Sequence, residues 1–173
     1  MKDVMIDIET LGTRSDAAII QIGACYFDRN TGEIGLGFSV NIDPSSMMDK
    51  FSVDYDTIKW WMGQSDRARQ LVTEFPTDIG AAISSLHDFL NKPDLKLWSH
   101  ATFDIPILMH AFEVTHIKFP IHYRKMRDIR TLMDIAEHHS VKERDGTHHH
   151  AIDDCKFQVG YCVDAMKKLY GKS

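Results

Sequence analysis

Residues 4–10, VMIDIET, form the stretch that most restricts the fold of this chain. Successive side chains of a β-strand point to opposite faces, so Asp7 and Glu9 share one face and three aliphatic residues share the other. Such alternation is common on an edge strand with a polar face in water, but this stretch opens a series of core-forming strands. Two buried carboxylates repel each other unless a cation lies between them. The stretch therefore predicts a buried strand that binds a hard divalent metal ion.

The rest of the chain predicts more strands and then helices. Residues 17–27 and 34–42 have strand composition and are joined by a hairpin-type turn at 28–33, so we expect an antiparallel meander. After Pro44 the periodicity becomes helical, and Thr77 is the expected N-cap of the clearest helix. The helices are expected at 54–64, 65–75, 77–92, 103–114, 126–139 and 151–170, with a strand at 95–99 and a polar loop at 141–147. This order predicts an α/β fold, a mixed sheet with helices on its faces.

Length and charge limit the class of protein. The 173 residues, 1–173, fit a single domain, because domains commonly contain about 100–200 residues. A net charge of −5 argues against a protein that coats nucleic acid through bulk positive charge, but not against one that holds a strand end through metal ions. The sequence shows neither a signal-peptide pattern nor the roughly 18 apolar residues of a membrane helix, which predicts a cytoplasmic protein without membrane contact. The three cysteines are expected to be buried free thiols.

Further carboxylates stand at helix starts. Asp104 follows the expected strand 95–99, and Asp153 and Asp154 open the last helix. Each of them could simply cap a helix or compensate its dipole. Their significance comes from their order along the chain, together with Asp7 and Glu9.

Three short motifs carry a family resemblance. DIETLG (7–12), SHATFD (99–104) and HHAIDD (149–154) resemble, in this order, the motifs of the DnaQ-like (DEDD) 3′-5′ exonucleases, and His149 five residues before Asp154 matches the DEDDh subgroup. TIKWWMGQS (57–65) and RDIRTL (127–132) look like the group with the phage DexA, exonuclease VIII-type and mycobacterial exoribonuclease enzymes. The resemblance spans residue 4 to about residue 160. It implies an RNase H-like, five-stranded mixed sheet of three antiparallel and then parallel strands.

The resemblance also implies the chemistry. Asp7, Glu9, Asp104 and Asp154 would bind two Mg²⁺ or Mn²⁺ ions about 4 Å apart, and His149 would be the general base. The enzyme would hydrolyse single-stranded nucleic acid, with DNA favoured, from its 3′ end and release 5′-mononucleotides. A poly(A)-type 3′-5′ exoribonuclease is the alternative, because the choice depends on recognition of the 2′-OH, which the sequence does not display.

The histidine run 148–150 offers more than one candidate base. On a continuous helix His150 and Asp154 would share a face, because they are four residues apart. The family pattern instead pairs His149 with Asp154, which requires that His149 lies in a loop before the helix.

Candidates for substrate contact are less specific. Leu11 would wedge against the terminal base or simply pack in the core. Adjacent helical residues point about 100° apart, so only one residue of the Trp60–Trp61 pair can face the site, and Trp61 is our candidate. Phe103 belongs to the middle motif. The family often has an asparagine upstream of the middle aspartate, whereas this chain has Ser99 five residues before it.

A basic stretch could contact phosphates. Arg127 is our candidate from this stretch, and Asp128 could orient such an arginine; a solvated surface explains at least half of the stretch. The basic residues are Arg124, Lys125, Arg127 and Arg130.

Other classes of protein stay open. A histidine-rich zinc or interaction module would use histidine and cysteine ligands, although three consecutive histidines do not easily converge on one ion. A catalytically inactive relative that only binds nucleic acid is disfavoured because all five motif residues are present. A homodimer is compatible with either class. The ligands of the zinc module would be His138, His139, His148, His149, His150 and Cys155.

Overall fold

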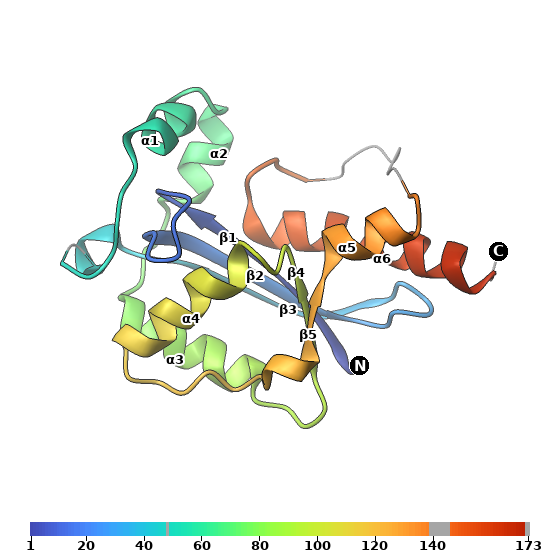
Figure 1. The fold of residues 1–173 in the computed structure, drawn as a ribbon. Helices are drawn as coiled ribbons and strands as arrows, with labels where there is room; N and C mark the ends of the chain where they lie inside the picture. Colours follow the sequence, from blue (N-terminus) through green and yellow to red (C-terminus); the bar gives the residue numbers. More distant parts are fainter. Residues whose placement is uncertain (48, 139–145, 172–173) are drawn as a thin grey trace.

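The computed structural model describes residues 1–47, 49–138 and 146–171, and its centre is a five-stranded sheet with the order β3-β2-β1-β4-β5 (Figure 1). β1, β2 and β3 pair antiparallel, whereas β4 pairs parallel with β1 and β5 parallel with β4. This arrangement confirms the RNase H-like mixed sheet that the motifs implied. The strands are β1 (Asp3–Thr10), β2 (Ile19–Phe27), β3 (Ile34–Asn41), β4 (Lys96–Ser99) and β5 (Met126–Asp128).

Helices cover both faces of the sheet (Figure 1). One core contains buried residues of α3 and α4 together with Val4, Ile6 and Ile8 of β1. The other contains buried residues of α6 together with Met5 of β1. Among the described residues, no helix is long and apolar enough to cross a membrane. The helices are η1 (Pro44–Met47), α1 (Tyr55–Met62), α2 (Asp66–Leu71), α3 (Ile79–Leu90), α4 (Asp104–Val114), η2 (Tyr123–Lys125), α5 (Ile129–Ile135) and α6 (Ala151–Tyr170).

β1 is the central strand, and all of its residues are buried. Asp7 and Glu9 are each only 8% exposed and continue the face of Met5, which packs under α6. The edge-strand interpretation of VMIDIET is therefore wrong. The sheet forces both carboxylates into the space where α6 crosses the end of β1.

Two expected elements differ from the structure. The helix expected at 126–139 is a short strand, β5, followed by α5, because Met126–Asp128 pair with Leu97–Ser99 of β4. The Asp128 carboxylate then caps α5 by accepting the amide N–H of Thr131 at 2.7 Å. The N-cap of α3 is Asp78 and not Thr77, since the Asp78 carboxylate accepts two amide protons of the first turn.

The expectations for the cysteines and for the loop at 141–147 have different outcomes. All three cysteines are buried and free. The expected loop at 141–147 is described only at residues 146–147, so most of it lies outside the described residues.

Candidate active site

The side chains of the three motifs meet at the end of β1. Two groups form there, and in each the potential metal-ligating atoms all lie within 4.8 Å of one another. Figure 1 shows how β1, the β4–α4 connection and the start of α6 converge to supply them. The groups are Asp7 with His100 and Asp104, and Glu9 with His149 and Asp154.

Asp104 is the most deeply buried of these carboxylates. It begins α4, its amide N–H donates to the His100 carbonyl at 3.0 Å, and it is 1% exposed. Its Oδ2 atom is buried and accepts no hydrogen bond from the residues that the structure describes. Burial, and then the negative charge of Asp7, raises the pKa of the Asp104 carboxyl well above its usual value. A buried acid beside a second acid is suited to a divalent cation, which would supply the missing counter-charge.

Removing this buried charge should stabilise the metal-free protein. The raised pKa of Asp104 means that the folded state disfavours its ionised form, so the group costs stability as pH rises above the usual pKa of about 3.9. We expect Asp104→Asn to raise the melting temperature at pH 7 in EDTA by about 2–4 °C, the shift that 1 kcal/mol produces at this chain length. The difference should shrink toward pH 4. Exposed Asp49→Asn is the control, and an unchanged or lower melting temperature for Asp104→Asn would contradict this account.

The start of α6 is fixed against β2 by two residues. A Cβ on Gly23 would lie 2.3 Å from the Ala151 carbonyl carbon, so only glycine allows the helix to pack this closely. Beside it, the buried Gln21 Oε1 accepts the amide N–H of Ala151 at 2.7 Å. The Gln21 Nε2 donates to Asn41 Oδ1 at 2.7 Å. The first turn of α6 is thus fixed in position relative to the sheet. This also fixes the position of the residues that precede the helix.

Because the start of α6 is fixed, the two histidines before it lie beside different aspartates. α6 begins at Ala151, and His149 precedes it with a left-handed φ of 61°. His150 Nδ1 contacts Asp153 Oδ2 at 2.9 Å. His149 lies instead with Asp154 and Glu9. A left-handed non-glycine residue is strained and is maintained by its surroundings, as is common at functional sites.

The motif analysis missed two residues of the site. Gln158, one turn after Asp154 on α6, donates from Nε2 to Asp7 Oδ1 at 2.7 Å and so orients that carboxylate. His100 belongs to the group with Asp7 and Asp104, and burial lowers its pKa to about 4, which leaves it neutral at pH 7. For Gln158, the available signal was its position four residues after Asp154, on the same face of the helix. His100 is part of the middle motif, residues 99–104.

A hollow of about 420 Å³ opens beside Glu9 and separates the roles of the two tryptophans. Trp60 is 45% exposed and lines the hollow together with Phe103. Its ring centroid lies 4.6 Å from that of His149. Trp61 is 6% exposed, and its indole N–H donates to the Thr10 carbonyl at 2.9 Å. The structure therefore places Trp61 in the core and Trp60 at the hollow, which corrects our choice between them.

Three other candidates lie away from this hollow. Leu11 lines a separate apolar hollow behind Trp61, which favours packing over a wedge against the base. Ser99 is fully buried, so it is not available for direct contact with a nucleotide. Arg127 donates to the carbonyls of Arg124 and Met126 at 2.8 and 2.7 Å.

The described histidines do not form a histidine–cysteine zinc site. Cys155 is fully buried and its thiol donates to the Gly23 carbonyl at 3.2 Å. Both groups of potential ligands in the described part of the chain contain two carboxylates and one histidine. His139 of the expected zinc module lies outside the described residues. A carboxylate-rich set suits Mg²⁺ or Mn²⁺ better than structural zinc.

Comparisons with known proteins agree with this geometry. The family model described as the 3′-5′ exoribonuclease Rv2179c-like domain matches residues 2–166. An exodeoxyribonuclease of Enterobacteria phage T4 is 26% identical over 162 residues, with 78% of this chain and 71% of that protein covered.

Solved structures share the fold. The DEDDh-family nuclease domain of 3′hExo, bound to rAMP, has a TM-score of 0.66 at 14% identity and covers 95% of this chain and 91% of that chain. S. pombe Pop2p with Mg²⁺ and Mn²⁺ bound has a TM-score of 0.63 at 15% identity, covering 99% and 85%. A zinc-bound complex of E. coli ExoI with single-stranded DNA has a TM-score of 0.68 at 13% identity, covering 99% and only 40%. At these identities the likeness shows the fold alone, and it confirms the sheet predicted from the motifs.

Proposed function

This chain belongs to the family of Rv2179c-like 3′-5′ exoribonuclease domains and is a 3′-5′ exonuclease, and we propose that it removes nucleotides from single-stranded 3′ ends with two Mg²⁺ or Mn²⁺ ions. The observation that carries the proposal is the pair of groups at the end of β1. They provide four buried carboxylates, two in each group, from three separate segments of the chain. Such a cluster is costly to fold without a cation, because its charges repel and are desolvated.

The carboxylates fit the proposed ions. Glu9 and Asp154 of one group would hold one ion and Asp7 and Asp104 of the other group the second ion, with His100 as a neutral nitrogen beside the second pair. Asp7 would also reach the first ion, as the resemblance implies. When bound, the ions would supply Lewis-acid stabilisation of the phosphate charge and a more acidic water. The protein itself orients the acids: Gln158 fixes Asp7 through its amide, and the anchored start of α6 fixes Asp154.

His149 is the proposed general base. It lies beside Glu9 and Asp154, before the helix and next to the half-exposed Trp60. A base at this position would take a proton from a water on the Glu9–Asp154 side of the scissile phosphate. Attack from this side in line with the leaving oxygen puts the 3′ oxygen of the preceding nucleotide on the Asp7–Asp104 side.

The hollow beside Glu9 would accept the terminal nucleotide. Trp60 and Phe103 give it an aromatic lining on which a base can stack without sequence preference. DNA is the favoured polymer, because the chain is similar to the phage T4 exodeoxyribonuclease. RNA is the second candidate because the family model carries an exoribonuclease description.

Blocking the 3′ hydroxyl tests the polarity of the proposed reaction. With Mg²⁺ or Mn²⁺, a 5′-labelled single strand should shorten progressively on a sequencing gel. A 3′-phosphate should slow its degradation by about tenfold or more, because the added negative charge is repelled by the carboxylates of the site. DNA, RNA and poly(A) of equal length, assayed in parallel, decide the polymer. Cleavage of a circular single strand would instead indicate an endonuclease and would refute the proposal.

A further inference from the structure

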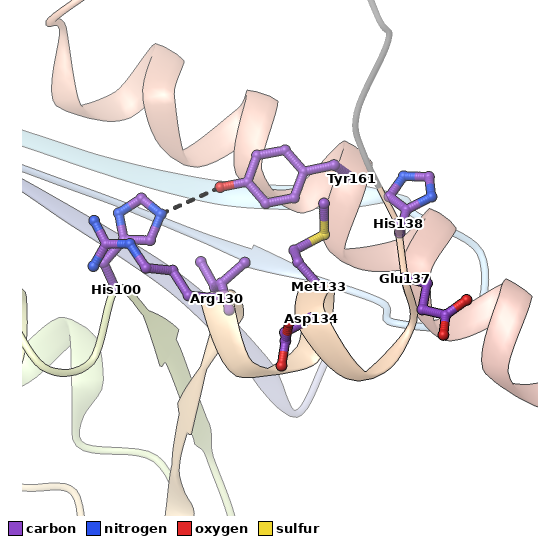
Figure 2. A pocket seen from close by; sticks show the side chains of 8 residues that line it. His100, Arg130, Met133, Asp134, Glu137, His138 and Tyr161 are labelled. Atoms are coloured by element: carbon purple, nitrogen blue, oxygen red, sulfur yellow. Dashed lines mark hydrogen bonds between the residues drawn. The ribbon is translucent and has the colours of Figure 1, made fainter.

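A second hollow, of about 500 Å³, lies between α5 and α6, and Figure 2 shows its lining. Arg130 and Met133 come from α5, Tyr161 from α6 and His100 from the β4–α4 connection. His100 also belongs to the metal-ligating group with Asp7 and Asp104, so this α5–α6 hollow opens directly beside the proposed reaction centre. Its volume is within the range of roughly 300–1,000 Å³ that small-ligand pockets occupy.

Arg130 is a cation in this hollow that is available for a ligand. Its side chain is exposed, and no hydrogen bond or ion pair connects its guanidinium to any residue in the described ranges. It lines the hollow together with His100, which belongs to the metal-ligating group with Asp7 and Asp104, and its charge also helps to lower the pKa of Asp128, two residues before it. Figure 2 shows Arg130 beside His100 at the end of the hollow that adjoins the site.

The other cations of this stretch are engaged elsewhere. Lys125 pairs with Asp94 at 3.0 Å. Arg127 donates to backbone carbonyls. The Arg124 guanidinium lies over the Tyr123 ring, 5.6 Å from its centroid. Arg130 is therefore the member of the basic stretch whose position and freedom suit a phosphate, although Arg127 was the sequence-based candidate.

The two hollows adjoin opposite halves of the reaction centre. The hollow beside Glu9 adjoins the His149 side, and the α5–α6 hollow adjoins the Asp104 side; they share no lining residue. With His149 as the base, the 3′ oxygen of the preceding nucleotide leaves on the Asp104 side. That nucleotide must therefore begin where the α5–α6 hollow opens.

We propose that the α5–α6 hollow holds the nucleotide on the 5′ side of the scissile bond and that Arg130 binds the phosphate on the 5′ side of that nucleotide. This assignment rests on the proposed exonuclease function. The Tyr161 ring and the Met133 side chain form an apolar wall against which the base can pack. Arginine suits the phosphate because its planar guanidinium can donate two hydrogen bonds at once.

The far end of the hollow limits the site to one nucleotide. Asp134 and Glu137 are exposed and line the hollow; Figure 2 shows Glu137 with His138 at the end away from His100, and Asp134 between the two ends, beside Met133. Their negative charges repel a further phosphate along the groove. The strand should therefore leave the hollow beyond Arg130, and the gain in rate from upstream phosphates should be largely complete with the first one.

Three small substrates isolate the Arg130 contact. The p-nitrophenyl ester of thymidine 5′-monophosphate has no preceding nucleotide, the dinucleotide TpT has one without a 5′-phosphate, and pTpT adds that phosphate; the uridine series replaces them where RNA is preferred. In the wild type we expect kcat/KM for pTpT to exceed that for TpT by about 10–100-fold, the usual value of a hydrogen bond to a charged group. Arg130→Ala should lower kcat/KM for pTpT to about that for TpT, and the ratio of the two within one variant measures the phosphate contact separately from any change that all three substrates share.

The matched control is Arg124→Ala, which removes an exposed arginine of the same stretch away from the hollow and should keep the 5′-phosphate advantage. Arg130→Lys should keep part of it. An unchanged advantage in Arg130→Ala would overturn the assignment. An equal loss on all three substrates would also overturn it, because Arg130 would then act on the reaction and not on the preceding nucleotide. If the wild type hydrolyses none of the three substrates, the proposed function itself is refuted, and this assignment with it.

Discussion

Asp7→Asn should lower kcat by about 10³-fold or more, because an amide cannot supply the charge that a catalytic metal ion needs, and such an ion contributes several kcal/mol to the transition state. Asp7 is the residue through which the two metal sites would be joined, since it lies with Asp104 and His100 on one side of β1 and beside Glu9 along the strand. The asparagine has the same shape and can still accept the hydrogen bond from Gln158 Nε2. The variant should therefore stay folded.

The control for this loss is Asp153→Asn. Asp153 is also a carboxylate at the start of α6, but it contacts His150 at 2.9 Å and the Thr147 amide at 3.1 Å. Its replacement should change kcat by less than about tenfold, the scale of one lost hydrogen bond. Degradation of a single-stranded oligonucleotide by the wild type should also stop in EDTA and return with excess Mg²⁺ or Mn²⁺. Activity that persists in EDTA, or in Asp7→Asn at the wild-type rate, would disprove a metal mechanism.

The sequence predicted the central strand because its evidence was local. Strict alternation in residues 4–10 determined which side chains share a face, and the strands after it made burial the better interpretation. β5 was missed because it has only three residues, and its sequence continues without a break into the pattern of α5. Its strand conformation comes from pairing with β4, a contact between segments that are far apart in the sequence.

From the sequence, only residues within the recognised motifs could be assigned to the site. The contact of Gln158 with Asp7 depends on how α6 crosses β1, and this crossing is set by the close approach at Gly23. The sequence could say that only one tryptophan of the pair faces the site. Which one packs inward depends on tertiary contacts, namely the apolar cluster of Trp61 with Ile20 and Val72 and its bond to the Thr10 carbonyl. Neither the Gln158–Asp7 contact nor the Trp61–Thr10 contact can be derived from the positions of these residues along the chain.

His149→Ala should lower kcat by roughly 10²–10⁴-fold, the usual effect of losing a general base. The same change at His148 or His150 should lower it by less than about tenfold, because a contact outside the reaction centre contributes on the order of one hydrogen bond. The reason is geometric. His150 is the N-cap of α6 and is directed to Asp153 at 2.9 Å, whereas His149 stands one residue outside the helix beside Glu9 and Asp154.

Single-turnover rates for the three alanine variants measure this difference directly. The position of His149 also permits it to be a metal ligand, and a titration with Mn²⁺ separates the two roles. Loss of a ligand should raise the Mn²⁺ concentration that gives half-maximal activity by about 10-fold or more, whereas loss of a base lowers the plateau and leaves that concentration nearly unchanged. We expect the second pattern, because Glu9 and Asp154 lie together as potential ligands, and the proposed arrangement adds Asp7 to them as a third carboxylate for this ion. If His150→Ala is the inactive variant and His149→Ala stays active, the residues before α6 adopt another arrangement when the substrate binds, and the base is His150.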